Sequence, residues 1–169
     1  MLHERDKTMA IEAVKAYFRT VGIEERVQEL SASSATVELA AAALHCEGAR
    51  IAKTLSFMVN GAAILIVAAG DAKIDNAKYK AFFSTKAKML TPEEAVELVG
   101  HAVGGVCPFA IREGVKVYLE ASLKRFETVF PACGSANSAI ELTIPELEQY
   151  SAYTSWVDVC KGWQQEASF

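Results

Sequence analysis

The hydrophobic pattern of this 169-residue chain opens with a helical period. From Glu4 to Val21, apolar residues recur every three or four positions, which predicts an amphipathic helix that Gly22 caps. Residues 26–30 (RVQEL) then alternate as in a short strand. The apolar face of the helix is predicted to contain Met9, Val14, Tyr17, Phe18 and Val21.

The clearest local pattern lies near the middle of the chain. Residues 49–59 alternate, Asn60 and Gly61 follow, and residues 62–69 form an apolar run of strand length. An Asn-Gly pair between two apolar strands is the strongest short signal for a β-hairpin. The sequence therefore predicts two antiparallel strands joined by a tight turn.

Lys53 occupies an unusual position in the first of these strands. In a regular strand it shares one face with Ile51, Leu55 and Phe57. A lysine there is costly to bury unless it is paired or used. Two interpretations stay open: the amine reaches water at a rim, or it points into a pocket and attracts an ester carbonyl, a phosphate or a carboxylate.

Capping signals predict the remaining helices. Thr36 is an N-cap for the alanine-rich residues 37–46, with Gly48 closing that helix. Thr91, followed by Pro92 and by Glu94 three residues on, forms a capping box. Helices are predicted over residues 74–83, 91–100 and 143–150, and a last helix within the tail 151–169, which contains Trp156 and Trp163.

The rest of the pattern indicates strands interleaved with helices, and so one mixed α/β domain over residues 1–169. Nothing resembles a signal peptide or a membrane span, and we predict a cytoplasmic protein. The four cysteines are widely spaced and are expected to be free thiols, so no metal and no cofactor are predicted. The further predicted strands span residues 115–120, 126–134 and 139–144.

A formal net charge of −4 argues against a protein that coats long nucleic acids. It does not exclude a protein that binds only the end of an RNA. One local basic cluster is either a solvated helix face or such a contact. It consists of Lys73, Lys78, Lys80, Lys86 and Lys88.

Residues 100–111 (GHAVGGVCPFAI) form the segment most indicative of a ligand-binding loop. Gly104 and Gly105 can adopt positive φ and leave backbone N–H groups open to an anion or a developing oxyanion. Pro108 removes one donor and stiffens the exit from the loop. The alternative is a plain Gly-Gly turn that joins two strands.

Cys107 raises the possibility of a thiol nucleophile, which needs a nearby base. His101 is the candidate base, although its neighbours are apolar, and a small buried residue that lines the loop is the competing interpretation of Cys107. A second loop, residues 131–139, is rich in small polar residues and has Gly134 near its apex. By itself it reads as a turn.

Together, three segments resemble the YbaK/ProX/EbsC family of aminoacyl-tRNA deacylases, which is similar to the editing domain of bacterial prolyl-tRNA synthetase. They are RIAKTLSFMVNGAAILIVAAGDAKID, GHAVGGVCPFAI and ACGSANSAIELTIPEL. The resemblance covers a core of about residues 36–150, on which the N-terminal helix and the C-terminal tail are expected to pack. It implies a single mixed, curved, barrel-like β-sheet flanked by helices.

The resemblance also implies an activity: hydrolysis, in trans, of the ester that joins a wrong, small amino acid to the 3′ end of a tRNA. An aminoacyl ester is already activated, so positioned water, an oxyanion-stabilising loop and an ammonium can suffice. The implied catalytic residues are Lys53, Gly104 and Gly105. The implied substrate-binding residues are Thr54, Val106, Cys107, Pro108, Gly134 and Ser135.

The chain departs from the family pattern in two places. The later loop reads CGSANSA, without the arginine common after its glycine, and Cys107 stands where a small hydroxyl residue is frequent. The acidic charge implies weak intrinsic affinity for tRNA, which a synthetase partner would assist. A non-catalytic module that binds aminoacyl-tRNA ends or a synthetase is the alternative function. Which amino acid is removed, and the oligomeric state, stay open.

Overall fold

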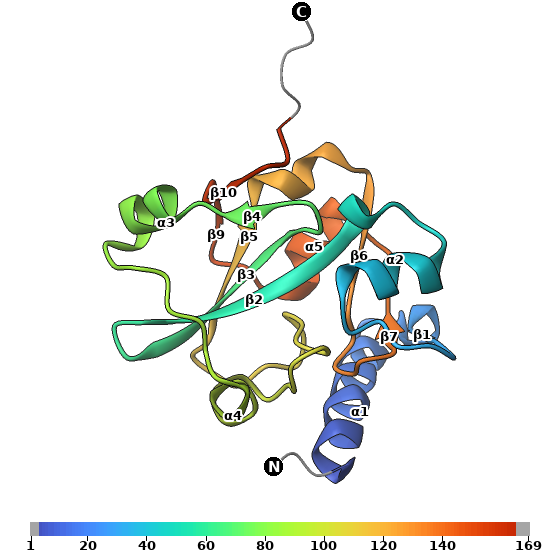
Figure 1. Ribbon diagram of the computed structural model, residues 1–169. Helices are drawn as coiled ribbons and strands as arrows, with labels where there is room; N and C mark the ends of the chain where they lie inside the picture. Colours follow the sequence, from blue (N-terminus) through green and yellow to red (C-terminus); the bar gives the residue numbers. More distant parts are fainter. Residues whose placement is uncertain (1–3, 165–169) are drawn as a thin grey trace, which may run out of the picture.

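The computed structural model, which describes residues 4–164, is built around one β-hairpin (Figure 1). Strands β2 (Ile51–Val59) and β3 (Ala62–Ala69) pair antiparallel, and Asn60 and Gly61 both have positive φ, 50° and 81°. Positive φ at both central residues is the geometry of a two-residue hairpin turn whose twist matches the strands. The predicted hairpin is confirmed.

This hairpin forms the centre of a six-stranded sheet with the order β8-β6-β2-β3-β5-β9. The pairs β2–β3 and β6–β8 are antiparallel, whereas β2–β6, β3–β5 and β5–β9 are parallel. The sheet curls, and helices lie on both of its faces (Figure 1), so the predicted mixed, curved α/β fold is confirmed. Its outer strands are β5 (Lys116–Glu120), β6 (Thr128–Pro131), β8 (Leu142–Thr143) and β9 (Ser155–Val157).

Two short two-stranded ladders flank this sheet. The first pairs β1 (Gln28–Glu29) with β7 (Ser138–Ala139), and the second pairs β4 (Lys73–Ile74) with β10 (Cys160–Lys161). The predicted strands over 26–30 and 139–144 are therefore present but shorter, and the second is divided between β7 and β8.

The two faces of the hairpin bury different cores. Leu65 and Val67 pack with helix α1 (Glu4–Thr20) and with Phe109 of the glycine loop. Ile64 and Ile66 pack on the opposite side against helix α3 (Asn76–Phe83) and the C-terminal segment. The even and odd positions of the strands thus serve two layers, as the pleat of a strand dictates.

Helix α1 forms as predicted, but its buried face is shifted. Val14 and Phe18 are fully buried, whereas Met9 is 59% exposed. Val21 lies beyond the helix and is also exposed. The helical period runs through Ala10 and the two buried residues, which turns Met9 outward, so its predicted burial is wrong.

Most predicted caps are confirmed. Thr36 caps helix α2 (Val37–Leu44), but His45 ends it in the left-handed conformation, so the prediction that Gly48 closes it is wrong. Asp75 caps α3. Helix α4 (Pro92–Glu94) has the predicted capping box and continues as a π-helical turn to Val99, and helix α5 (Ile144–Ser151) has a second capping box.

The C-terminal segment contradicts the prediction of a last helix. Residues 155–157 extend the sheet as β9 beside β5, and residues 160–161 form β10. The buried carboxylate of Glu120 accepts hydrogen bonds from the N–H groups of Val159 and Cys160. These main-chain groups are satisfied by a neighbouring strand and a side chain, so the segment needs no helix. Residues 165–169 lie outside the described part of the chain.

Candidate functional site

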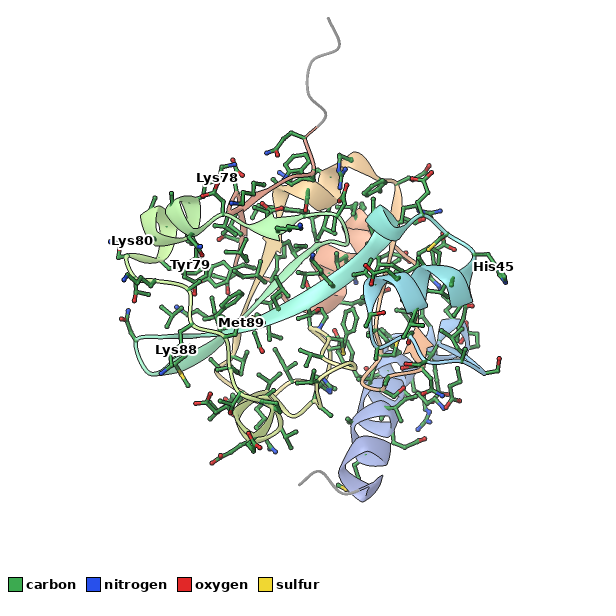
Figure 2. The ribbon with its side chains drawn as sticks, viewed as in Figure 1. His45, Lys78, Tyr79, Lys80, Lys88 and Met89 are labelled. Atoms are coloured by element: carbon green, nitrogen blue, oxygen red, sulfur yellow. The ribbon has the colours of Figure 1, made fainter. Side chains whose placement is uncertain are left out.

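A cavity of about 300 Å³ runs along the outer edge of β2. Its walls come from α2 and the residues before it, the glycine loop, the connection that leads into α4, and the strands β6 and β7. Met89 of that connection lies beside β2 in Figure 2, opposite Phe57 near the end of the strand. Of the predicted site residues, Lys53, Thr54, Gly104 and Val106 line this cavity.

Lys53 is half-buried, and main-chain oxygens hold its amine. The Nζ atom donates to the carbonyl of Gly70 at 3.3 Å and to the carbonyl of Ala72. An ammonium has three donors, so one remains for a ligand. Burial lowers the pKa of this amine below its usual value of 10.5, because a desolvated site disfavours the charged form.

The turn that holds the amine is itself tightly fixed. A Cβ atom on Gly70 would come within 2.0 Å of the Gly48 carbonyl oxygen, so only glycine fits there. Asp71 accepts two hydrogen bonds from the guanidinium of Arg125, at 2.6 and 2.9 Å. This bidentate pair of hydrogen bonds fixes the orientation of the turn. The carbonyls that receive Lys53 are therefore positioned before any ligand arrives.

The two glycines of the loop have different surroundings. Gly104 has φ +94° and lines the cavity. The N–H of Gly105 instead donates to the Ala102 carbonyl at 3.0 Å, and a Cβ atom on Gly105 would come within 2.6 Å of the Ser135 nitrogen. The loop thus offers the cavity Gly104, whereas the N–H of Gly105 is already used and its α-carbon packs against the later loop.

Gly105, Gly134 and Ser135 line a separate hollow of about 380 Å³ on the other side of the loop. Val103 lines both hollows. The tip of the later loop, residues 134–137, therefore packs against the first loop and does not line the cavity, whereas Ala132, Ser138 and Ala139 at its two ends do line it.

Cys107 and His101 do contact each other, but both are buried and neither lines the cavity. The Sγ atom lies 3.5 Å from Nε2 of His101, and that nitrogen donates to the Phe109 carbonyl at 2.8 Å. The nitrogen nearest the thiol therefore carries a proton and cannot act as its base. Burial raises the pKa of the Cys107 thiol to about 12 and lowers the pKa of His101. Pro108 is buried as well, and neither it nor Cys107 lines the cavity.

Sequence reasoning missed part of the cavity. Ser34 and Val37 contribute one wall, and Met89 contributes another. The hydroxyl groups of Ser34 and Thr54 are buried and have no hydrogen-bond partner among the described residues. A buried hydroxyl without a partner is costly, which makes a polar ligand favourable there. The small-residue run SASSAT before α2 was the available signal for Ser34, whereas Met89 lies in a segment without periodicity.

Four of the five lysines of the basic cluster are exposed, on and around α3. Lys78 instead pairs with Asp158 at 3.1 Å. Figure 2 shows Lys80 on α3 and Lys88 on the following connection, next to Met89 at the cavity. Lys88 is thus the member closest in sequence to the cavity wall.

Within the part of the chain that the structure describes, no group of three or more His, Cys, Asp or Glu side chains is placed to hold a metal ion. No helix between residues 4 and 164 is long and apolar enough to cross a membrane. The cavity walls carry one charged side chain, that of Lys53, together with several hydroxyl groups. The other lining residues are mostly apolar, so the cavity suits a small ligand with an apolar part and a few polar groups.

Fold and site together define a class: a curled, mixed α/β half-barrel with a small cavity at the outer edge of its central hairpin. A model of the aminoacyl-tRNA editing domain matches residues 31–150, and the chain belongs to this family. The resemblance found in the sequence is confirmed. The matched range begins before α2 and ends at α5, so it includes every wall of the cavity.

The chain is also similar to three known proteins. The chain is 54% identical to the "Uncharacterized protein YwhH" of Bacillus subtilis (strain 168), over 92% of this chain and 100% of that one. It is 32% identical over 90 residues to a proline–tRNA ligase of Lysinibacillus sphaericus (strain C3-41), a match that spans 53% of this chain and 16% of the ligase. A crystal structure described as a candidate trans-editing enzyme for prolyl tRNA synthetase has a TM-score of 0.81 at 28% identity, covering 96% of this chain and 100% of that chain.

Proposed function

We propose that this protein is a trans-acting aminoacyl-tRNA deacylase that hydrolyses the ester of a tRNA mischarged with a small amino acid. The observation that carries the proposal is the shared cavity, where the amine of Lys53 and the backbone of Gly104 line one small hollow. Family membership supports aminoacyl-tRNA as the substrate class. The role in the cell would be quality control in translation.

The cavity supports a mechanism without a protein nucleophile. The free N–H of the Lys53 ammonium would hold the substrate and offset negative charge on the acyl oxygen. The Gly104 backbone would stabilise the oxyanion as water attacks the carbonyl carbon. The ester bond to the terminal ribose oxygen would then break, and the proton of the water would pass, through the free hydroxyl of that ribose, to the leaving oxygen as the amino acid is released. Such prearranged donors act in a desolvated site, where removing one typically costs about 100- to 1000-fold in rate.

Size would select the amino acid. A cavity of about 300 Å³ leaves room for a small acyl group with part of the terminal ribose. A hydrophobic pocket distinguishes one methylene by only about 10- to 200-fold, which is why a second, hydrolytic site is useful in synthesis of correct aminoacyl-tRNA. We further propose that Thr54 and Val106 contact the substrate, and that α1 and the C-terminal segment form one unit with the matched core.

A deacylation panel tests the proposal. A series of tRNAs, each charged with a different small amino acid, is incubated with the protein, and release of each amino acid is followed over time. The proposal expects release of at least one of them, at a rate that the Lys53→Ala variant loses. Binding of charged tRNA without release from any member would instead favour a non-catalytic binding module.

A further inference from the structure

The outer edge of β2 is paired at both ends but not in the middle. At the start of the strand, Ala52 lies opposite Pro131 of β6. Near its end, the Met58 N–H donates to the Lys88 carbonyl at 2.8 Å. Between these two points lies Thr54, and the cavity occupies the space beside it.

The direction of the Thr54 main-chain groups follows from the ladder. Successive residues of an antiparallel strand turn their N–H and C=O groups to opposite edges. Met58 and Ser56 bond outward, the latter through its carbonyl to Leu90 at 3.1 Å. Thr54 therefore also turns its N–H and C=O groups outward. The main-chain groups of the residues on either side, Lys53 and Leu55, point toward β3.

In the described part of the chain, no group forms a hydrogen bond with the N–H or the C=O of Thr54. Strand β6 turns away after Pro131, and its next residue, Ala132, bridges to Ala139 instead. Among residues 4–164, neither the N–H nor the C=O of Thr54 has a hydrogen-bond partner, and its hydroxyl has none either. One donor and one acceptor of the main chain thus face the cavity side by side.

We propose that the aminoacyl group of the substrate fills this gap as a single strand residue opposite Thr54. Its α-amino group donates to the Thr54 carbonyl, and its acyl carbonyl accepts from the Thr54 N–H. An amino acid presents this donor and acceptor at the spacing that two residues of an antiparallel pair use. The inference rests on the proposed function, because it describes how the same cavity would bind the aminoacyl group of that substrate.

This pairing has two consequences for recognition. It requires the α-amino group but is indifferent to the side chain, so selection among amino acids falls to the surrounding walls, which include Val37 and Val106. It also fixes the plane of the acyl carbonyl at a point where the Gly104 loop forms the facing wall. The substrate is therefore oriented by main-chain groups, which every substitution of Thr54 except proline would keep.

A binding titration with stable analogues tests the inference directly. The probes are 3′-alanylamino-3′-deoxyadenosine, whose amide resists hydrolysis, and the 3′-propionylamino analogue, which lacks only the α-amino group. Binding is followed through the backbone amide signals of the full chain by NMR. We expect the alanyl analogue to move the Thr54 amide proton downfield, and the propionyl analogue to bind about 10-fold more weakly, the value of one good hydrogen bond.

Two variants sharpen the test. Thr54→Pro deletes the outward N–H at an edge position that contributes no bond to the sheet, so the fold should tolerate it. It should weaken binding of the alanyl analogue. The matched control Thr54→Val keeps both main-chain groups and should keep the preference for alanyl over propionyl. If Thr54→Pro does not fold, the Thr54 amide signal of the unmodified chain still decides.

The outcomes separate this inference from the proposed function. A silent Thr54 amide on binding, equal affinity for the two analogues, or no binding of either overturns the pairing, even where charged tRNA is hydrolysed. A downfield shift and a preference for the alanyl analogue, with no hydrolysis of any charged tRNA, supports the pairing and rejects the deacylase.

Discussion

The Nζ atom of Lys53 lies 3.3 Å from the carbonyl oxygen of Gly70, in a turn that only glycine can form there. The Lys53 side chain is therefore held in one position in the cavity. Two main-chain carbonyls hold its amine, and the pair of hydrogen bonds between Asp71 and Arg125 holds the turn. A long, flexible side chain has become a fixed donor, which is what a charge-stabilising role requires.

Replacing this amine should remove activity and leave the fold. We expect Lys53→Ala to lower kcat/KM for a mischarged tRNA by about 100-fold or more, the usual loss for one electrostatic donor. Melting should shift little, because a half-buried lysine pays desolvation that its loss relieves. The matched control is Lys73→Ala, an exposed lysine three residues beyond Gly70. An unchanged rate in Lys53→Ala would remove this residue from the mechanism.

The same amine predicts an alkaline limit. Burial lowers the pKa of Lys53 below 10.5, so the ammonium is lost at a lower pH than in the unfolded chain. If the charged form acts, the rate falls as pH rises through the lowered pKa. Across that window the unfolded chain binds more protons, so this group's contribution to folding stability rises with pH. The measurement is the deacylation rate as a function of pH, corrected for spontaneous hydrolysis of the ester. A corrected rate that keeps rising through the alkaline range would contradict the prediction.

The sequence predicted the hairpin and most of the helix caps correctly because each depends on neighbours along the chain. Asn60 and Gly61 both favour the positive φ values that this turn requires, so the two residues alone specify it. The C-terminal strands were missed because β9 is specified by a distant partner, β5, and by the buried carboxylate of Glu120. Local periodicity contains no record of such contacts.

The site divides in the same way. Lys53 and Gly104 were predicted from residue type, and the fold places both at one cavity. The difference between Gly104 and Gly105 could not be predicted, because it depends on which glycine packs against Ser135 in a loop about thirty residues later. The open edge at Thr54 was also hidden, since it arises where β6 leaves the sheet.

The packing of Gly105 gives a third prediction. In Gly105→Ala the new methyl group would lie 2.6 Å from the Ser135 nitrogen and 2.7 Å from the Gly134 carbonyl carbon, so one loop must move. We expect a loss of about 1–3 kcal/mol in unfolding free energy, with reduced deacylation. Gly48→Ala is the matched control, because its methyl would meet only a side-chain carbon at 3.6 Å. Equal melting temperatures for both variants would contradict the packing argument.

The buried thiol predicts resistance to alkylation. Cys107 is fully buried and its pKa is raised to about 12 by burial, so almost no thiolate is available at neutral pH. A thiol reagent should reach Cys46 first, the one partly exposed cysteine of the described residues, without loss of activity. Peptide mapping of the modified protein checks the order. Rapid modification of Cys107 together with inactivation would revive a thiol mechanism.

Arg26 and Glu146 give a prediction at acid pH, because they tie the segment before β1 to α5. The Arg26 guanidinium, 2.7 Å from a Glu146 oxygen, lowers the pKa of that carboxyl to about 2. A carboxyl with a lowered pKa contributes stability above its unfolded value of 4.5, and this is lost as pH falls toward about 2. Arg26→Gln should therefore be less stable than the unmodified chain at pH 7, by an amount that shrinks across this window. Urea unfolding at a series of pH values measures the difference, and a constant gap between the two proteins would show that the ion pair contributes nothing. Lys78→Gln, which breaks an exposed pair with Asp158, is the control and should change stability less.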